Sequence, residues 1–334
     1  CALPIYAEVV YFPTMADLMN APDGSLNGKI AYVSNAMKAN QDGSGYGPSG
    51  QPRRAGPTIA AKKGALAIVI KSVGTDHHRV PHTGVTSWGD GVSPIPAGAL
   101  SVPDAENLER IFKRGQPVKM HLLLTPRFLG DRESGNVIAD VPGSDPDAGI
   151  VLVSGHLDSW DMGTGAIDDG AGVAIAAAAA KRIMDSGQPR RTIRVFFAGA
   201  EEVGGLGGEA YFAAHKDEKH VLAMESDFGA DRVWRAEYKL PETAKTVKDR
   251  VVAALEPLGI VTGRDEAGGG EDIKDLVKSG VAVIDLNQDG TRYFDLHHTA
   301  DDTLDKIDPA QLAQNVAAWT AVISIVANAE EPLR

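Results

Sequence analysis

The chain has 334 residues, of which 43% are hydrophobic and 23% are charged, an ordinary balance for a globular protein with a sizeable core. Its formal net charge of −12 disfavours nucleic acid and anionic membrane surfaces as partners. The single cysteine, Cys1, excludes an internal disulfide and a metal site built from several thiolates. At about 150 residues per domain, the length predicts two domains.

Features near both ends of the chain bear on the cellular location of the protein. The longest strongly apolar stretch, residues 316–327, is shorter than the ~20 residues that a membrane span needs, and it predicts a buried helix. No signal peptide is visible. The first residue is Cys1 rather than methionine, which suggests a processed product or a fragment more than a lipid-anchor site.

Residues 1–128 are predicted to form the first domain. Buried strands are expected at residues 29–34 and 65–73, with a short helix between them at residues 58–64. A closing strand is expected at residues 117–126. The stretch 41–57 is rich in glycine and proline and predicts a loop. A second loop is expected to expose three scattered histidines to solvent, namely His77, His78 and His82.

Residues 129–334 are predicted to form the second domain. Strands are expected at residues 136–143, 149–155, 192–200, 220–227 and 281–286. Helices are expected at residues 171–187, 208–216, 242–259 and 308–327. This alternation predicts an α/β layered domain with a largely parallel sheet.

Acids and histidines follow the ends of several predicted strands, where ligands bind in such sheets. His156 and Asp158 follow the strand 149–155, Glu201 and Glu202 follow the strand 192–200, and Asp227 ends the strand 220–227. Asp168 and Asp169 lie at the turn that opens the helix 171–187, and His297 and His298 follow the last strand. Carboxylates and imidazoles without thiols suit zinc, cobalt or manganese. Two such ions ~3.5–4 Å apart would turn a water between them into a strong nucleophile.

The tandem glutamates are expected to divide their work. One would bind metal, and the other would stay free as the general base that takes a proton from the water. Asp158 lies two residues after His156, a spacing that suits either a carboxylate orienting the histidine ring or a turn residue. Asp169 is suited to cap the following helix, and that structural role competes with a chemical one.

At these residues the sequence resembles the di-zinc metallo-exopeptidases of the aminopeptidase Y and bacterial leucyl aminopeptidase type, within them the plasma glutamate carboxypeptidase (carboxypeptidase Q) branch. The resemblance rests on "SGHLDSWDMGTGAIDDGAG", "AEEVGGLGGEAYF", "LAMESDFG", "GGGEDIKDL" and "YFDLHHTADDTLDKIDP". It implies a three-layer zinc-exopeptidase domain with a mostly parallel mixed sheet, preceded by a smaller β-rich protease-associated domain. Family members carry a further catalytic segment ahead of that inserted domain, and this sequence does not contain it.

The resemblance also implies residue roles. His156 and Asp227 would bind one zinc ion, Glu202 and His298 the other, and Asp168 would bridge them. Glu201 would be the general base, and Asp158 would support the ligands. His298 is preferred to His297 because Thr299 follows it, as a Thr or Ser follows the family's ligand. A cis Asp168–Asp169 peptide bond is implied, and Tyr293, Asp295 and Gly269 are expected to line the substrate pocket.

The resulting hypothesis is an exopeptidase that hydrolyses dipeptides or trims short peptides through a metal-bridging hydroxide. A small peptide would be its substrate, a homodimer is compatible with the resemblance, and a periplasmic or extracellular location is implied by resemblance. Two alternatives stay open: a non-catalytic, receptor-like protein on the same fold, and a single-zinc acyltransferase resembling glutaminyl cyclases. The sequence contains no G-x-S-x-G or H-E-x-x-H motif that would favour another hydrolase class.

Overall fold

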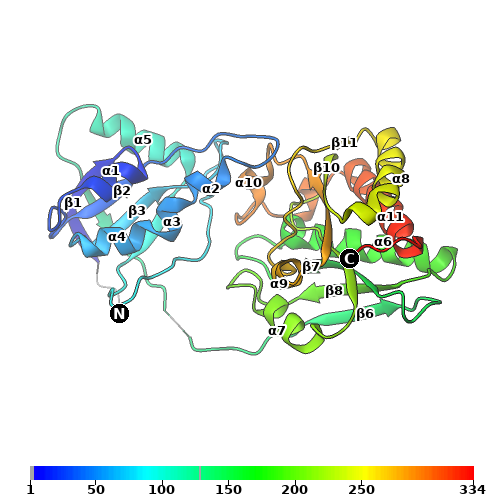
Figure 1. Cartoon of the computed structure of the whole chain (residues 1–334). Helices are drawn as coiled ribbons and strands as arrows, with labels where there is room; N and C mark the ends of the chain where they lie inside the picture. Colours follow the sequence, from blue (N-terminus) through cyan, green and yellow to red (C-terminus); the bar gives the residue numbers. More distant parts are fainter. Residues whose placement is uncertain (1–3, 128) are drawn as a thin grey trace. The chain divides into compact units, whose positions relative to one another are not determined.

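The structure is a computed structural model that describes residues 4–127 and 129–334, so Cys1 lies outside the described residues. The chain divides into two compact units. Unit 1 comprises residues 1–132 and 294–301, and unit 2 comprises residues 133–293 and 302–334. Figure 1 labels the helices and strands of both units. The short segment 294–301 therefore belongs with unit 1, although the sequence-based division at residue 128 assigned it to the second domain.

Unit 1 contains a five-stranded sheet with the order β4-β3-β2-β1-β5. Its strands are β1 (Ile5–Phe12), β2 (Ile30–Val33), β3 (Ala67–Lys71), β4 (Ala97–Leu100) and β5 (Lys119–Leu122). Neighbouring strands are parallel except for β5, which pairs with β1 in the antiparallel direction. The three strands expected in this region are β2, β3 and β5, whereas β1 and β4 were not predicted from the sequence.

Helices cover both faces of this sheet. On one face, α1 (Met15–Asn20) and α4 (Gly56–Lys62) pack through Met15, Leu18 and Ala60. On the other, α5 (Val102–Phe112) packs through Ala105 and Leu108. The expectation of a loop over 41–57 was wrong in part, because α2 (Tyr46–Ser49) and α3 (Gln51–Arg54) lie within it. Unit 1 is thus an α/β layered unit, and its assignment as a protease-associated domain stays a prediction.

Unit 2 contains a seven-stranded mixed sheet with the order β11-β10-β12-β9-β7-β8-β6. Its strands are β6 (Val137–Val141), β7 (Ile150–His156), β8 (Thr192–Ala198), β9 (His220–Glu225), β10 (Val233–Lys239), β11 (Val261–Thr262) and β12 (Ala282–Gln288). The central strands β8, β7, β9 and β12 run parallel. Strand β6 is antiparallel to β8, and β10 is antiparallel to β12 but parallel to β11. The α/β class and the mostly parallel mixed sheet are therefore confirmed.

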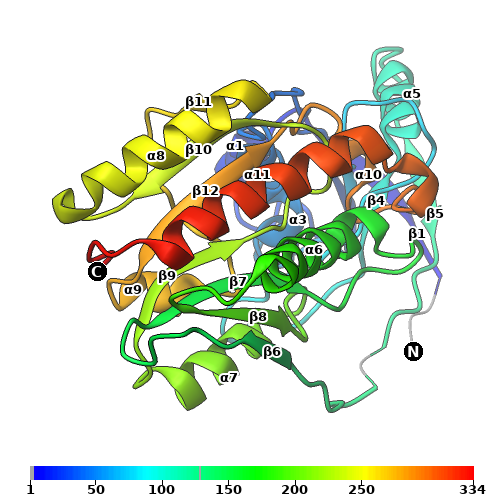
Figure 2. The ribbon, with the colours of Figure 1, turned by 90° about the vertical axis from the view of Figure 1, so that its right-hand side faces the viewer.

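The sheet of unit 2 lies between two layers of helices (Figure 2). One layer consists of α6 (Ala171–Ser186), α8 (Lys245–Leu255) and α11 (Pro309–Asn328), and the other of α7 (Leu206–His215) and α9 (Lys274–Lys278). Side chains of β7 alternate between the layers, with Val151 and Val153 toward α6 and Leu152 toward α7. This alternation makes β7 a strand that is buried on both faces, as its apolar run predicts.

One helix, α11, is long and apolar enough to span a membrane by length and composition. Half of its most apolar window is buried in the protein, and Trp319, Val322 and Ile323 are fully buried in the main core of unit 2. Alanines of α6, including Ala176 and Ala179, belong to the same core and allow close packing of the helices. The helix is thus a core element of unit 2, as expected from the sequence.

Candidate metal centre

The parallel register of unit 2 brings several acidic segments to one edge of its sheet. β7 ends at His156, which pairs with Ala198 at the end of β8, shortly before Glu201. On the other side of β7, Ser154 pairs with Glu225 at the end of β9, two residues before Asp227. The carboxyl ends of these three strands therefore meet, as the sequence-based analysis expected.

His156 lies at the centre of this edge and is only 1% exposed. Its Nε2 atom lies 3.1 Å from Oδ1 of Asp168 and 3.4 Å from Oδ1 of Asp227. Its Nδ1 atom lies 2.9 Å from the backbone oxygen of Asp158, a contact that makes Nδ1 the donor. Burial works against the charged ring, but contacts with Asp168 and Asp227 raise the pKa of His156. The side chain thus directs Nε2 at two carboxylates.

Asp158 contacts the ring of His156 and also the backbone of the tandem glutamates. Its backbone oxygen, rather than its carboxylate, orients the ring of His156. Its carboxylate accepts hydrogen bonds from the backbone N–H groups of Glu201 and Glu202, at 3.0 and 3.2 Å. One residue therefore supports both the histidine and the tandem glutamates.

Asp168 and Asp169 lie in a tight turn before α6, and the peptide bond between them is cis, as predicted. The Asp169 carboxylate accepts hydrogen bonds from His156 N and Gly172 N, both at 3.1 Å. Asp169 therefore accepts a hydrogen bond from the first turn of α6, although the N-cap position itself is occupied by Gly170. Asp302 accepts hydrogen bonds from Ile167 N at 2.5 Å and from Asp168 N at 3.3 Å, so it holds the turn from the opposite side.

The adjacent glutamates have different surroundings. The indole Nε1 of Trp160 donates a hydrogen bond to Oε2 of Glu202 at 2.6 Å. Burial raises the pKa of Glu201 to about 8, and the negative charge of Asp227 adds to this shift. A pKa near neutrality suits Glu201 to proton transfer. The hydrogen bond from Trp160 instead keeps the carboxylate of Glu202 in a fixed position.

The donor set fits a divalent cation. Two groups offer ligand atoms within 4.8 Å of one another, namely His156, Asp168 and Glu202, and His156, Asp169 and Asp227. Burial raises the pKa of Asp227 to about 6, with repulsion from Asp168 contributing to the shift. Crowded carboxylates of this kind are stabilised by a cation, and oxygen and imidazole donors suit zinc.

The last predicted ligand, His298, belongs to unit 1 and has a left-handed backbone conformation with φ of 59°. It is 8% exposed and stacks on His297, with ring centroids 3.6 Å apart. Its role as a metal ligand beside the residues of unit 2 stays a prediction.

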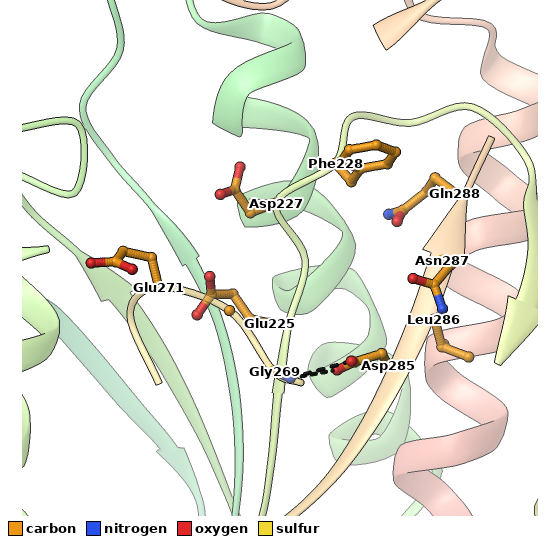
Figure 3. Close-up of a pocket in the computed structure, with 10 residues that line it drawn as sticks. Glu225, Asp227, Phe228, Gly269, Glu271, Asp285, Leu286, Asn287 and Gln288 are labelled. Carbon is orange, nitrogen blue, oxygen red and sulfur yellow. Dashed lines mark hydrogen bonds between the residues drawn. The ribbon is translucent and has the colours of Figure 1, made fainter. Parts of the chain in front are cut away.

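A pocket of about 190 Å³ adjoins Asp227 in unit 2 (Figure 3). It is lined by Glu225, Asp227, Phe228, Gly269, Gly270, Glu271, Asp285, Leu286, Asn287 and Gln288. Asp285 accepts hydrogen bonds from the backbone of Gly268 and Gly269, which shapes the loop along the pocket. Burial and repulsion from Asp272 and Asp227 raise the pKa of Glu225. The pocket is therefore small, polar and rich in carboxylates.

The expected pocket residues have mixed placements. Gly269 lines the pocket. Tyr293 is buried and packs on Phe228, with ring centroids 4.4 Å apart. Asp295 belongs to unit 1, where its carboxylate accepts hydrogen bonds from Thr75. Binding of substrate by these three residues stays a prediction.

Sequence reasoning missed two residues that support the site. Trp160 lies in the motif "SGHLDSWDMG", and Asp302 lies in "HHTADDT". Tryptophan is not a metal-ligand residue, and Asp302 does not directly follow a predicted strand, so neither was singled out. A hydrogen bond from an indole to a carboxylate leaves no trace in the spacing of residues. Only the tertiary contact identifies these residues.

Comparisons with known proteins identify the family of the chain. A sequence model of peptidase family M28 matches residues 136–323. Carboxypeptidase Q from Bos taurus is 37% identical over 98% of this chain and 69% of its own length. The human carboxypeptidase Q is 38% identical over the same shares.

Solved structures extend the likeness to the fold. The peptidase M28 precursor from Shewanella amazonensis is 47% identical and has a TM-score of 0.96, covering 99% of this chain and 75% of its own. A zinc aminopeptidase from Bacillus subtilis is 20% identical with a TM-score of 0.62, covering 98% of this chain and 76% of its own, a likeness in fold alone.

The fold and the site thus define a hydrolase of the metallopeptidase class, and the chain belongs to peptidase family M28. Within that family it is similar to the carboxypeptidase Q proteins over nearly its full length.

Proposed function

We propose that the protein is a zinc-dependent exopeptidase that hydrolyses dipeptides or terminal residues of short peptides. The observation that carries the proposal is the convergence of His156, Asp168, Glu202 and Asp227 on one buried edge beside Glu201. These residues would hold two zinc ions, with Asp168 shared and His298 as the fifth ligand. Zinc, when bound, would polarise the scissile carbonyl and make the attacking water more acidic.

Glu201 would act as the general base. Its carboxylate would take a proton from the attacking water and deliver it to the departing amine as the peptide bond breaks. Asp158 would hold Glu201 in place through the backbone N–H group at 3.0 Å. This division leaves Glu202, held by Trp160, to bind metal.

The pocket beside Asp227 favours a substrate group of small size and positive charge. Its lining offers the carboxyl groups of Asp227, Glu271 and Asp285 and no basic side chain, so it favours an ammonium group over a carboxylate. A free α-amino group is the cation common to all short peptides. We therefore propose that the free amino end of the substrate lies toward this pocket.

A location outside the cytoplasm is part of the proposal. It is supported by the Shewanella amazonensis relative, which is described as a precursor. Fractionation of cells that express the full-length protein, followed by immunoblotting, would test the location. Recovery with a cytoplasmic marker alone would contradict it.

The test of the function is a dipeptide panel assayed with zinc-loaded protein, including amino-blocked and carboxyl-blocked peptides. The Glu201→Gln variant is expected to lose about 10²–10⁴-fold in kcat while it retains zinc, because only the base is removed. Glu209→Gln, the same change at an exposed position of α7, is the matched control. Full activity of Glu201→Gln would contradict the assigned base.

The same samples distinguish the alternatives. Two zinc ions per chain are expected, whereas one ion would favour the acyltransferase resembling glutaminyl cyclases. Zinc binding without hydrolysis of any peptide would favour the receptor-like protein. Hydrolysis of amino-blocked peptides at the rate of free ones would contradict the proposed orientation of the substrate.

A further inference from the structure

The loop around His82 in unit 1 departs from the expectation of exposed histidines. His77 and His78 are exposed, but His82 is only 4% exposed. Its ring lies 4.9 Å, between centroids, from the rings of both His297 and His298. Tyr46 closes the group by stacking on Phe294 at 4.2 Å and meeting His297 edge-on. All of these residues belong to unit 1.

The hydrogen-bond partners determine which ring nitrogen of each histidine carries a proton. Nη1 of Arg53 lies 3.1 Å from Nδ1 of His82, and a guanidinium group can only donate. Nδ1 of His82 must therefore accept, which places its proton on Nε2. That Nε2 lies 2.9 Å from Nδ1 of His297 and donates to it. His297 consequently carries its own proton on Nε2, and neither of its nitrogens presents an unused lone pair.

His298 is held in the opposite tautomer. Its Nδ1 lies 3.2 Å from the backbone oxygen of Thr83, which can only accept, so the proton of His298 is on Nδ1. The same oxygen accepts a hydrogen bond from Arg53 at 2.9 Å. The backbone N–H and the hydroxyl of Thr83 both donate to the carbonyl of His298, at 2.9 and 3.1 Å. The ring and its left-handed backbone are thus secured by one residue.

We propose that Arg53, His82 and Thr83 are positioning residues that select His298, and not His297, as the metal ligand and present it through Nε2. The inference rests on the proposed function, in which His298 binds zinc. Hydrogen bonds of this kind fix the tautomer and orientation of metal-binding histidines. Residues 53, 82 and 83 lie outside the region 136–323 that matches the family model.

A second interpretation treats the three histidines as a metal site of their own. Ligand atoms of His82, His297 and His298 lie within 4.8 Å of one another. However, both nitrogens of His82 and Nδ1 of His297 already have hydrogen-bond partners, and the guanidinium of Arg53 next to His82 repels a cation. The hydrogen-bond network therefore disfavours a third ion.

The first test measures the tautomers directly in the whole protein. Long-range ¹H–¹⁵N spectra of ¹⁵N-histidine-labelled protein, with and without zinc, report which nitrogen carries the proton. We expect Nε2–H for His82 and His297 and Nδ1–H for His298, already before zinc is added. A proton on Nδ1 of His82, or on Nε2 of His298 in the zinc-free protein, would overturn the proposal.

The second test measures zinc affinity by competition with a chelator. His82→Phe keeps a ring but removes both hydrogen bonds, and it is expected to weaken binding of the His298-dependent zinc by about 10–100-fold. His82→Gln, whose amide can still donate to His297, is expected to retain more affinity than His82→Phe. His77→Phe, in the same loop with a side chain that is 75% exposed, is the control.

Each outcome is informative. An affinity of His82→Phe within twofold of wild type overturns the proposal, and so does a third zinc ion that this variant removes. If His82→Phe does not fold, the spectra of the wild type decide alone. The proposed function, in which His298 binds zinc, is tested separately by His298→Ala. Retention of both zinc ions in that variant contradicts the proposed function, whatever the tautomers are.

Discussion

At the scale of residues, the site gives two neighbouring glutamates different surroundings. The backbone N–H groups of Glu201 and Glu202 both donate to the carboxylate of Asp158, but the hydrogen bond from Trp160 goes to the side chain of Glu202. Glu201 instead lies where burial raises its pKa to about 8. The proposed division into a base and a metal ligand is therefore supported by the different contacts of the two side chains.

Trp160 is expected to matter for metal binding through its hydrogen bond to Glu202. Trp160→Phe keeps most of the ring surface but removes the donor to Glu202, so zinc affinity should fall about 10–100-fold. Chelator competition measures the change. The matched control is Trp234→Phe, because the buried indole nitrogen of Trp234 has no hydrogen-bond partner among the described residues. Equal affinities for the two variants would contradict this role.

At the scale of elements, two glycines allow α6 to approach the end of β7. A β-carbon on Gly155 would lie 2.5 Å from Oδ2 of Asp169. A β-carbon on Gly172 would lie 1.9 Å from the backbone oxygen of Ser226 and 2.4 Å from Oδ1 of Asp169. The start of α6 can therefore carry Asp168 and Asp169 against the strand ends only because these positions lack side chains.

Gly172→Ala is accordingly expected to displace the start of α6 and the turn before it. Overpacking of this kind should lower the free energy of unfolding by about 1–3 kcal/mol, and it should weaken zinc binding as well. Urea unfolding and zinc titration measure the two effects. Gly135→Ala is the control, since a β-carbon there meets nothing within 4 Å. A Gly172→Ala variant as stable as this control would refute the packing argument.

At the scale of the whole molecule, the largest core and the acidic edge belong to the same unit. The core of unit 2 joins its sheet to α6, α8 and α11, whereas its strand ends collect carboxylates whose pKa values are raised by burial. Charges gathered in this way oppose folding unless a cation is bound. Metal binding and the stability of unit 2 should therefore be coupled.

Removal of zinc should lower the thermal stability of the protein. A ligand present at 100 times its Kd stabilises the folded state by about 2.7 kcal/mol. For a unit of this size that corresponds to a fall in Tm of about 5–10 °C when EDTA removes zinc. Circular dichroism melting curves measure the shift, with the preformed Zn–EDTA complex as the control. An unchanged Tm would contradict the coupling.

Much of the fold and part of the site could be predicted from local patterns. The apolar run before His156 predicted β7, and its neighbours in the parallel sheet followed in the same way. The strands β1, β4, β10 and β11 were missed. Charged residues interrupt the apolar pattern of β1 and β10, whereas β4 and β11 have only four and two residues. The burial of His82 was missed because its hydrogen-bond partners, Arg53 and His297, lie 29 and 215 residues away in the sequence.

By itself, the sequence determined the chemical types at the strand ends and the order of elements that brings them to one edge, since parallel strands aligned by βα connections end on the same side. Only the tertiary structure decided what each side chain contacts. It showed that Asp158 orients His156 through its backbone and holds Glu201 through its carboxylate. The reason is physical: residue spacing limits which groups can meet, but hydrogen bonds depend on angles and distances that arise only after packing.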